Sequence, residues 1–232
     1  MLLSRVRVAP QGLDPQHLHA VMKGDAYGNH QLLWKLFPDD EERPFLFRQE
    51  DERTLASSGS PGGLPLFYVL STTDPRDVPG LLQCETRRFE PKLDVGSRLY
   101  FRLRANPVVA RRRDNEARSR VHDVLMDAKA RARSEKIDDP TAIRGAMDEA
   151  AVRWLANKER SERAGYSLLH EPEVTGYRQH VHRRRGREIR FSSVDYEGAL
   201  EVVDPRRFLS SLASGIGRSR AFGCGMWMIR RA

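Results

Sequence analysis

Tyr27 and His30 lie three residues apart in the segment Asp25-Ala-Tyr-Gly-Asn-His-Gln-Leu-Leu-Trp34. On a helix, residues three apart share one face. Histidine gives and takes protons near neutral pH. Cleavage of RNA needs little else, because the 2′-hydroxyl attacks the adjacent phosphate once deprotonated and the leaving 5′-oxygen needs a proton. The alternative is a structural His30, half-buried beside Trp34.

A lysine, two histidines and two cysteines are further candidates for binding a phosphate or a metal ion. Lys35 follows His30 and could stabilise negative charge on a phosphate, although a solvated lysine is the alternative. His180 and His182 share a face if they lie on a strand, but two imidazoles without a third ligand make a weak metal site. The two cysteines form no CxxC pair. We therefore expect neither a metal nor another cofactor.

A glycine-rich run near the C-terminus, Gly215-Ile-Gly-Arg-Ser-Arg-Ala-Phe-Gly-Cys-Gly225, follows a predicted helix and precedes a predicted strand. Glycines let the backbone approach a phosphate closely. The expected RNA-binding residues of this run are Gly215, Gly217, Arg218, Arg220, Gly223 and Gly225. The run is not a dinucleotide-binding fingerprint, which joins a strand to a following helix. A tight connection that happens to be rich in glycine is the alternative.

A cluster of arginines is predicted at the tip of a hairpin between strands at about 174–182 and 188–203. It comprises Arg183, Arg184, Arg185 and Arg187 around Gly186. Such a cluster can enter a nucleic-acid groove or clamp its backbone. A solvated charged turn is the alternative reading.

The charge distribution favours a polyanionic partner. The 232 residues carry a formal net charge of +8. Three segments, 102–120, 177–190 and 205–232, contain only arginine as basic residue and carry net charges of +5, +5 and +6. The remainder of the chain is therefore acidic. Clustered arginines neutralise phosphates and release counterions, so we expect a localised binding surface.

The elements that must position these residues follow a β-α-β-β-α-β order twice. In the first half, strands are predicted at 2–8, 45–47, 64–70 and 84–89, with a helix from Asp25 to about Phe37, a loop at 57–63 and a short helical turn at 77–82. In the second half, a strand over 97–109 is followed by a charged insertion at about 111–139. A helix begins at Thr141, the hairpin follows, and Asp204-Pro205 opens a helix that ends at Gly215. The last predicted strand covers 223–229.

This order predicts an α+β protein of two tandem ferredoxin-like (βαββαβ, RRM-like) domains. We place the N-terminal domain, which carries His30, at residues 1–93. The C-terminal domain, at 94–232, contains the insertion, the basic hairpin and the glycine-rich loop.

The chain resembles the CasE family, the CRISPR endoribonucleases of type I-E systems within the wider repeat-associated RNA-binding superfamily. The resemblance spans nearly the whole chain. Its matching segments are Leu3-Ser-Arg-Val, Tyr27-Gly-Asn-His-Gln-Leu-Leu-Trp-Lys-Leu-Phe-Pro38, Leu99-Tyr-Phe-Arg-Leu-Arg-Ala-Asn-Pro107, Glu197-Gly-Ala-Leu-Glu-Val-Val-Asp-Pro205 and the glycine-rich run. The long, charged insertion departs from the pattern.

The resemblance implies an endoribonuclease that cuts pre-crRNA at the 3′ base of the CRISPR repeat hairpin. It implies His30 as general acid or base with Tyr27 beside it, products with a 5′-hydroxyl and a 2′,3′-cyclic or 3′-phosphate, and a basic hairpin that grips the RNA stem. The expected partners are repeat RNA and the other subunits of the Cascade complex. The alternatives are a non-catalytic RNA-binding subunit on the same fold and, less well supported, a metal-dependent nuclease.

The sequence gives no sign of a membrane partner. No stretch approaches the roughly 20 apolar residues of a membrane span, and the N-terminus lacks the apolar run of a signal peptide. We expect a cytoplasmic protein.

Overall fold

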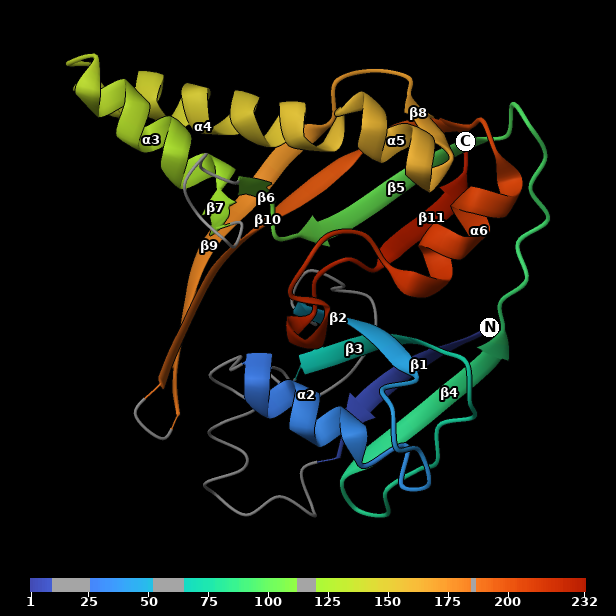
Figure 1. Cartoon of the computed structure of the whole chain (residues 1–232). Helices are drawn as coiled ribbons and strands as arrows, with labels where there is room; N and C mark the ends of the chain where they lie inside the picture. Colours follow the sequence, from blue (N-terminus) through green and yellow to red (C-terminus); the bar gives the residue numbers. More distant parts are fainter. Residues whose placement is uncertain (10–25, 52–64, 112–119, 185–186) are drawn as a thin grey trace. The chain divides into compact units, whose positions relative to one another are not determined.

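The computed structural model describes residues 1–9, 26–51, 65–111, 120–184 and 187–232 (Figure 1). These residues form two compact units. The first unit contains residues 1–92 together with 213–215 and 220–226, and the second contains 93–212, 216–219 and 227–232. The sequence boundary placed all of 94–232 in the second domain, whereas two short parts of the glycine-rich run group with the first.

The sheet of the first unit has the strand order β2-β3-β1-β4, with every pair antiparallel. The strands are β1 (Leu2–Val8), β2 (Phe45–Asp51), β3 (Pro65–Ser71) and β4 (Leu82–Arg88). Helix α2 (Ala26–Trp34) lies between β1 and β2 in the chain and covers one face of the sheet (Figure 1). β3 is a central strand that is buried on both faces, which explains its nearly continuous apolar sequence.

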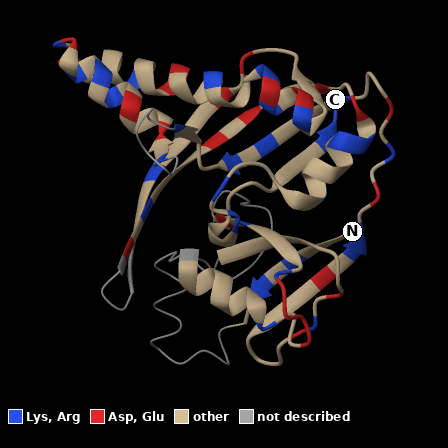
Figure 2. Ribbon diagram, viewed as in Figure 1, with Lys and Arg blue, Asp and Glu red and all other residues tan. Residues whose placement is uncertain are grey.

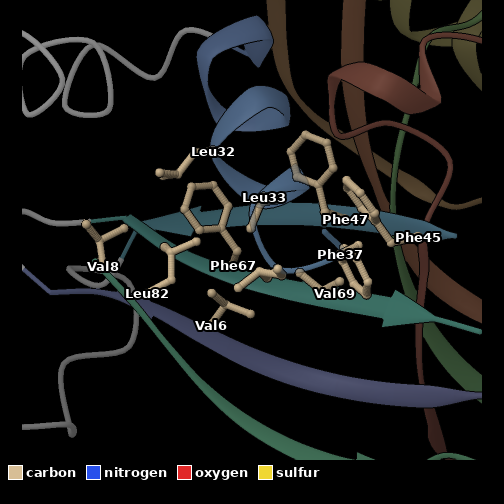
Figure 3. Close-up of a cluster of buried hydrophobic side chains, with 11 residues drawn as sticks. Val6, Val8, Leu32, Leu33, Phe37, Phe45, Phe47, Phe67, Val69 and Leu82 are labelled. Carbon is tan, nitrogen blue, oxygen red and sulfur yellow. The ribbon is translucent and has the colours of Figure 1, made fainter. Parts of the chain in front are cut away.

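Apolar side chains between α2 and this sheet form the core of the first unit. Alternate residues of each strand point to the helix because successive side chains of a strand point to opposite faces. Figure 3 shows how the rings of Phe45, Phe47 and Phe67 and the side chains of the valines meet Leu33 and Phe37. Phe37 and Phe45 stack with their ring centroids 5.0 Å apart. This packing fixes which face of α2 is buried.

The sheet of the second unit has the order β11-β5-β10-β8, with β9 also paired to β10. Its strands are β5 (Arg98–Ala105), β8 (Tyr166–Leu168), β9 (Glu173–Arg184), β10 (Arg187–Val202) and β11 (Trp227–Arg231). One face of the sheet is buried and carries the side chains of Leu103, Tyr196 and Trp227. The helices associated with this unit are α4 (Pro140–Leu155), α5 (Lys158–Ala164) and α6 (Pro205–Ser214).

Part of the charged insertion is a small structural element of its own. β6 (Val108–Arg111) pairs with β7 (Arg120–Asp123), and α3 (Val124–Ser134) follows directly. The Asp123 carboxylate accepts hydrogen bonds from the backbone N–H groups of Leu125 and Met126, so it caps α3. α3 then packs along α4 (Figure 1).

The caps predicted from the sequence for both ends of helix α6 are confirmed. Asp204 accepts a hydrogen bond from the backbone N–H of Arg207 at the start of α6, and Gly215 ends that helix with a φ of +74°.

Several predicted boundaries were wrong. The strand expected over 97–109 is broken at Asn106, because Pro107 has no backbone N–H for a sheet. The expected helical turn at 77–82 is a turn closed by an isolated bridge between Val78 and Leu82. α2 ends at Trp34 with hydrogen bonds to the third residue back rather than the fourth, so the helix stops before Phe37. The last strand begins at Trp227, not at Gly223. The predicted cap Asp25, the loop at 57–63, Arg185 and part of the insertion lie outside the described residues.

Candidate active site

The side chain of His30 lies on α2 among three aromatic rings of the first unit. Its ring centroid is 6.2 Å from that of Trp34, 5.9 Å from that of Phe45 and 6.5 Å from that of Phe47. The residue is partly exposed, so the imidazole is packed on its aromatic side without being sealed in the core. Its Nε2 is buried and has no hydrogen-bond partner among the described residues.

The residue next to His30 fixes this part of the helix to the sheet. Asn29 is fully buried, and its Nδ2 donates a hydrogen bond of 2.6 Å to the Oε1 of Gln49 on β2. Buried side-chain hydrogen bonds of this kind tie two elements together because an unpaired amide would be costly. The backbone of α2 is therefore anchored one residue from the imidazole.

The electrostatic surroundings of His30 favour its neutral form. Burial lowers the pKa of His30 below its ordinary value, and the positive charge of Arg43 lowers it further. Burial also lowers the pKa of Arg43, with a further contribution from the charge of Arg220. A neutral imidazole can accept a proton, and neighbouring guanidinium groups can stabilise an anion. The first unit thus brings one base and two arginines into a single electrostatic group.

Arg220 reaches this group through the glycine-rich run. It opens the short 3₁₀ helix η3 (Arg220–Phe222), which packs against α2. Its guanidinium donates a hydrogen bond of 2.6 Å to the backbone oxygen of Ser214. At Gly223, φ is +79° and an added Cβ would lie 3.2 Å from the Phe47 ring. Glycine at this position allows the run to approach the ring that stacks on His30.

The other predicted residues of the run do not all lie in the same unit. Gly215, Gly223 and Gly225 fall in the first unit with Arg220, while Gly217 and Arg218 fall in the second. Arg218 forms a backbone bridge with Asn106, whose Nδ2 donates a hydrogen bond of 2.7 Å to the hydroxyl of Ser219. The two arginines of the run are therefore assigned to different units.

The predicted hairpin is formed by β9 and β10, in which Arg184 faces Arg187 and Arg183 faces Glu188. Charged residues of both signs occur along its strands (Figure 2). It belongs to the second unit, as does the whole basic segment 177–190.

The segment 102–120 is less available for a polyanion than its net charge indicated. Two arginines of this segment, and Arg98 just before it, lie on β5 and are paired across the sheet with acidic residues of β10. The pairs are Arg98 with Glu201 at 3.5 Å, Arg102 with Glu197 at 2.8 Å and Arg104 with Asp195 at 2.9 Å. Residues directly opposite each other in an antiparallel pair interact in this way. Part of the expected basic surface is therefore neutralised within the protein.

A family model described as "CRISPR associated protein" matches residues 1–231 of the chain. The chain belongs to this CRISPR-associated family. The resemblance to CasE is thereby confirmed.

Two relatives and one solved structure illustrate the match. The chain is 28% identical over 204 residues to the CRISPR system Cascade subunit CasE of Escherichia coli, covering 87% of this chain and 90% of the relative. It is also 28% identical to the CRISPR-associated endoribonuclease Cse3 of Thermus thermophilus, covering 92% of this chain and 88% of the relative. The structure of Thermus thermophilus Cse3 bound to an RNA representing a pre-cleavage complex has a TM-score of 0.65 at 25% identity, covering 99% of this chain and all of that one.

Two more of the predicted site residues, Tyr27 and Lys35, belong to α2 or follow it directly. Tyr27 is one turn before His30 on α2 and is partly exposed, as the spacing predicted. Lys35 lies just beyond the end of α2 and is exposed. An exposed lysine at this position fits the solvated alternative, and its contact with a phosphate stays a prediction.

Sequence reasoning missed Arg43 and Asn106. Arg43 follows four acidic residues, 39–42, just before β2, so the net charge of this stretch is negative and gave no sign of a basic site. Asn106 directly precedes Pro107 at the end of the run Leu99-Tyr-Phe-Arg-Leu-Arg-Ala-Asn-Pro107. Since a proline interrupts a strand, Pro107 was the sequence signal that could have drawn attention to Asn106.

The described residues hold no group of three or more His, Cys, Asp or Glu side chains able to bind a metal ion. None of the helices in the described ranges is long and apolar enough to cross a membrane.

Proposed function

We propose that this chain is an endoribonuclease that binds the CRISPR repeat stem-loop and cleaves pre-crRNA at the 3′ base of the hairpin. The observation that carries the proposal is the position of His30, which is partly exposed, packs against aromatic rings and lies near Arg43, whose charge, after burial, lowers the pKa of the imidazole. The relative Cse3 is named an endoribonuclease, and a Cse3 structure at 25% identity holds an RNA representing a pre-cleavage complex.

His30 acts as the general base in the proposed reaction. The neutral imidazole accepts the proton of the 2′-hydroxyl, and the 2′-oxygen then attacks the adjacent phosphorus. The bond between phosphorus and the 5′-oxygen breaks, and that oxygen takes up a proton. The products are a 2′,3′-cyclic phosphate, which can open to a 3′-phosphate, and a 5′-hydroxyl. This chemistry uses a nucleophile that the RNA itself supplies, so it requires no metal.

The neighbours of His30 support charge and geometry in this scheme. Arg43 and Arg220 would stabilise the extra negative charge that develops on the phosphate in the transition state. Tyr27, one helical turn from His30, would position the ribose or transfer a proton. We assign no such part to Lys35, because it is exposed beyond the end of the helix.

Binding of the stem-loop is assigned to the basic hairpin and the glycine-rich run. Arg183, Arg184, Arg185 and Arg187 would grip the RNA stem, and Arg218 with the glycines of the run would lie against its backbone. Since the relative CasE is named a Cascade subunit, we propose that this chain stays on its product and joins such a complex.

Each unit is also proposed to be a ferredoxin-like domain, with the boundary near residue 93. The order β2-β3-β1-β4 and the order β11-β5-β10-β9 are the same arrangement of four strands, in which the third strand lies between the first and second. The first unit has no described helix between β3 and β4, and this is the main departure from the ideal unit.

The test is cleavage of a synthetic CRISPR repeat RNA by wild type and by His30→Ala, with excess EDTA in every reaction. We expect wild type to cut in EDTA and His30→Ala to lose about 10²- to 10⁴-fold in rate, with RNA affinity retained. Lys35→Ala is the matched control on the same segment and should cut normally. Equal cleavage by wild type and His30→Ala would remove His30 from the mechanism. Binding without cleavage by wild type would leave an RNA-binding subunit, and loss of activity in EDTA would indicate a metal-dependent nuclease.

A further inference from the structure

A pocket of about 410 Å³ lies in the second unit, where the insertion meets the hairpin. Its volume is within the range of about 300–1,000 Å³ that is usual for sites of small organic groups. Four segments contribute to its lining: the end of β5 with the start of β6, β7 with the start of α3, and the middle parts of β9 and β10. All of these segments belong to the second unit, whereas His30 belongs to the first.

Aromatic rings form one wall of the pocket. His180 and Phe191 face each other across the hairpin strands, and their rings stack with centroids 4.4 Å apart and planes 12° apart. The Nε2 of His180 is 2.8 Å from the hydroxyl of Ser193, which is buried, so the orientation of the imidazole is fixed. Each ring of this stacked pair keeps one outer face, and a flat aromatic ligand can add to such a stack.

Exposed aliphatic side chains also line the pocket. Val121, Met126 and Val181 all line the pocket and are among the most exposed large apolar residues of the described chain. The Sδ of Met126 accepts a hydrogen bond of 3.2 Å from the Nε2 of Gln179, which holds the thioether in place. Exposed apolar side chains gathered in one concave site indicate a ligand or partner.

Polar groups at the edge of the pocket could read a base. Asn106 is 4% exposed, and its Oδ1 has no hydrogen-bond partner among the described residues. Arg190 and Gln179 also line the pocket. Amide and guanidinium groups beside a stacking wall are the elements with which proteins recognise single-stranded bases.

The position of the pocket connects it to the RNA-binding segments rather than to an apolar protein surface. Val181 is three residues from Arg184, or about 10 Å along a strand. Asn106 is hydrogen-bonded to Ser219 of the glycine-rich run. An RNA held by the hairpin arginines would therefore pass close to this opening.

We propose that this pocket binds one unpaired nucleobase of the RNA, next to the stem that the hairpin grips. The base would add to the stack of His180 and Phe191, and Met126 and Val181 would be among the side chains that line the pocket around it. This inference rests on the proposed function, because it takes RNA to be the ligand.

A protein–RNA double-mutant cycle tests the proposal. All variants carry His30→Ala so that the RNA remains intact. The probe is a synthetic repeat RNA with unpaired nucleotides on both sides of the stem, and a series of the same RNA with one abasic residue at each unpaired position. Phe191→Ala should weaken binding of the intact RNA about 5- to 100-fold, as loss of one stacked base does. One abasic RNA should bind the His30→Ala parent as weakly as it binds the variant that also carries Phe191→Ala.

Ile189→Ala is the matched control, because Ile189 lies two residues along the same strand and is 43% exposed but does not line the pocket. It should bind every RNA as the parent does. Thermal unfolding of each variant checks that the hairpin remains folded, and Val181→Asp, at a position that is 51% exposed, gives a second variant that cannot create a core cavity.

The proposal is overturned if no abasic position shows coupling to Phe191, or if Phe191→Ala weakens all the RNAs by the same factor. An unchanged affinity for RNA combined with loss of association with another protein subunit would assign the pocket to a protein and would also overturn it. Failure of the nuclease proposal is seen separately, as an absence of cleavage by the chain with His30 intact, and leaves the binding cycle readable.

Discussion

Arg43 lies close enough to His30 for its positive charge to lower the pKa of the imidazole, although burial makes the larger contribution. The two residues come from different elements: His30 from α2 and Arg43 from the connection that leads into β2. In the proposed reaction Arg43 has two effects. It lowers the pKa of His30, which favours the neutral imidazole, and its positive charge stabilises the negative charge on the phosphate.

Replacing Arg43 with Gln should raise the pKa of His30, because a nearby positive charge is removed while burial remains. The imidazole resonances of His30 would titrate at higher pH in an NMR experiment. If cleavage occurs, the acidic limb of its pH profile should move in the same direction and the rate at the optimum should fall. Arg76→Gln, a charge removed from an exposed ion pair with Asp39, is the control. An unchanged titration in Arg43→Gln would contradict the electrostatic account.

The lowered pKa of His30 also predicts how stability depends on pH. The unfolded chain takes up a proton near pH 6.5, whereas the folded protein resists it, so the unfolded state binds more protons between the two pKa values. Wild type should therefore lose stability as the pH falls below about 6.5, until the folded pKa is passed. His30→Gln should show a shallower loss over the same range in urea unfolding experiments. Identical slopes would show that His30 makes no contribution.

Gly223→Ala should lower both stability and any cleavage activity. Its φ of +79° costs a residue with a Cβ roughly 1–2 kcal/mol, and the new Cβ would also press on the Phe47 ring that stacks on His30. Gly96→Ala is the matched control, because φ is +85° there but nothing lies within 4 Å of the added Cβ. We expect Gly96→Ala to lower the stability of the protein and to leave its cleavage activity unchanged. Equal activity of the two variants would mean that the Phe47 contact has no role in positioning His30.

Cys84 should be a poor nucleophile. Burial, followed by the charge of Asp77 and a hydrogen bond to its carboxylate, raises the pKa of the thiol to about 12. Since the thiolate is the reactive form, alkylation by iodoacetamide at pH 8 should be about 1,000-fold slower than for a thiol with the reference pKa of 9.0. Peptide mapping by mass spectrometry measures the rate at this site, and Asp77→Asn should accelerate it. Fast labelling of the folded wild type would contradict the prediction.

The local features of the chain were predictable because they depend on neighbouring residues. Asp204-Pro205 specifies the start of α6 and Gly215 its end, since a capping carboxylate, a proline and a glycine each act within one turn. The spacing of Tyr27 and His30 on one helix was likewise readable. The errors arose at Pro107 and at Trp34. The proline interrupts the strand predicted over 97–109, and a tightened last turn ends α2 at Trp34, although the apolar pattern continues to Phe37.

The amino-acid sequence alone determined the α+β class, the order of most strands and helices, and the presence of a candidate imidazole and of clusters of arginine. Only the tertiary structure decided which arginines are free to act. Cross-strand pairing neutralises Arg102 and Arg104 with acidic residues more than 90 positions away in the chain. Folding brings Arg43 close to His30, and it brings Arg220, 177 positions further along the chain, close to Arg43. Charge interactions depend on distance in space, and sequence spacing fixes that distance only within a helix or a strand.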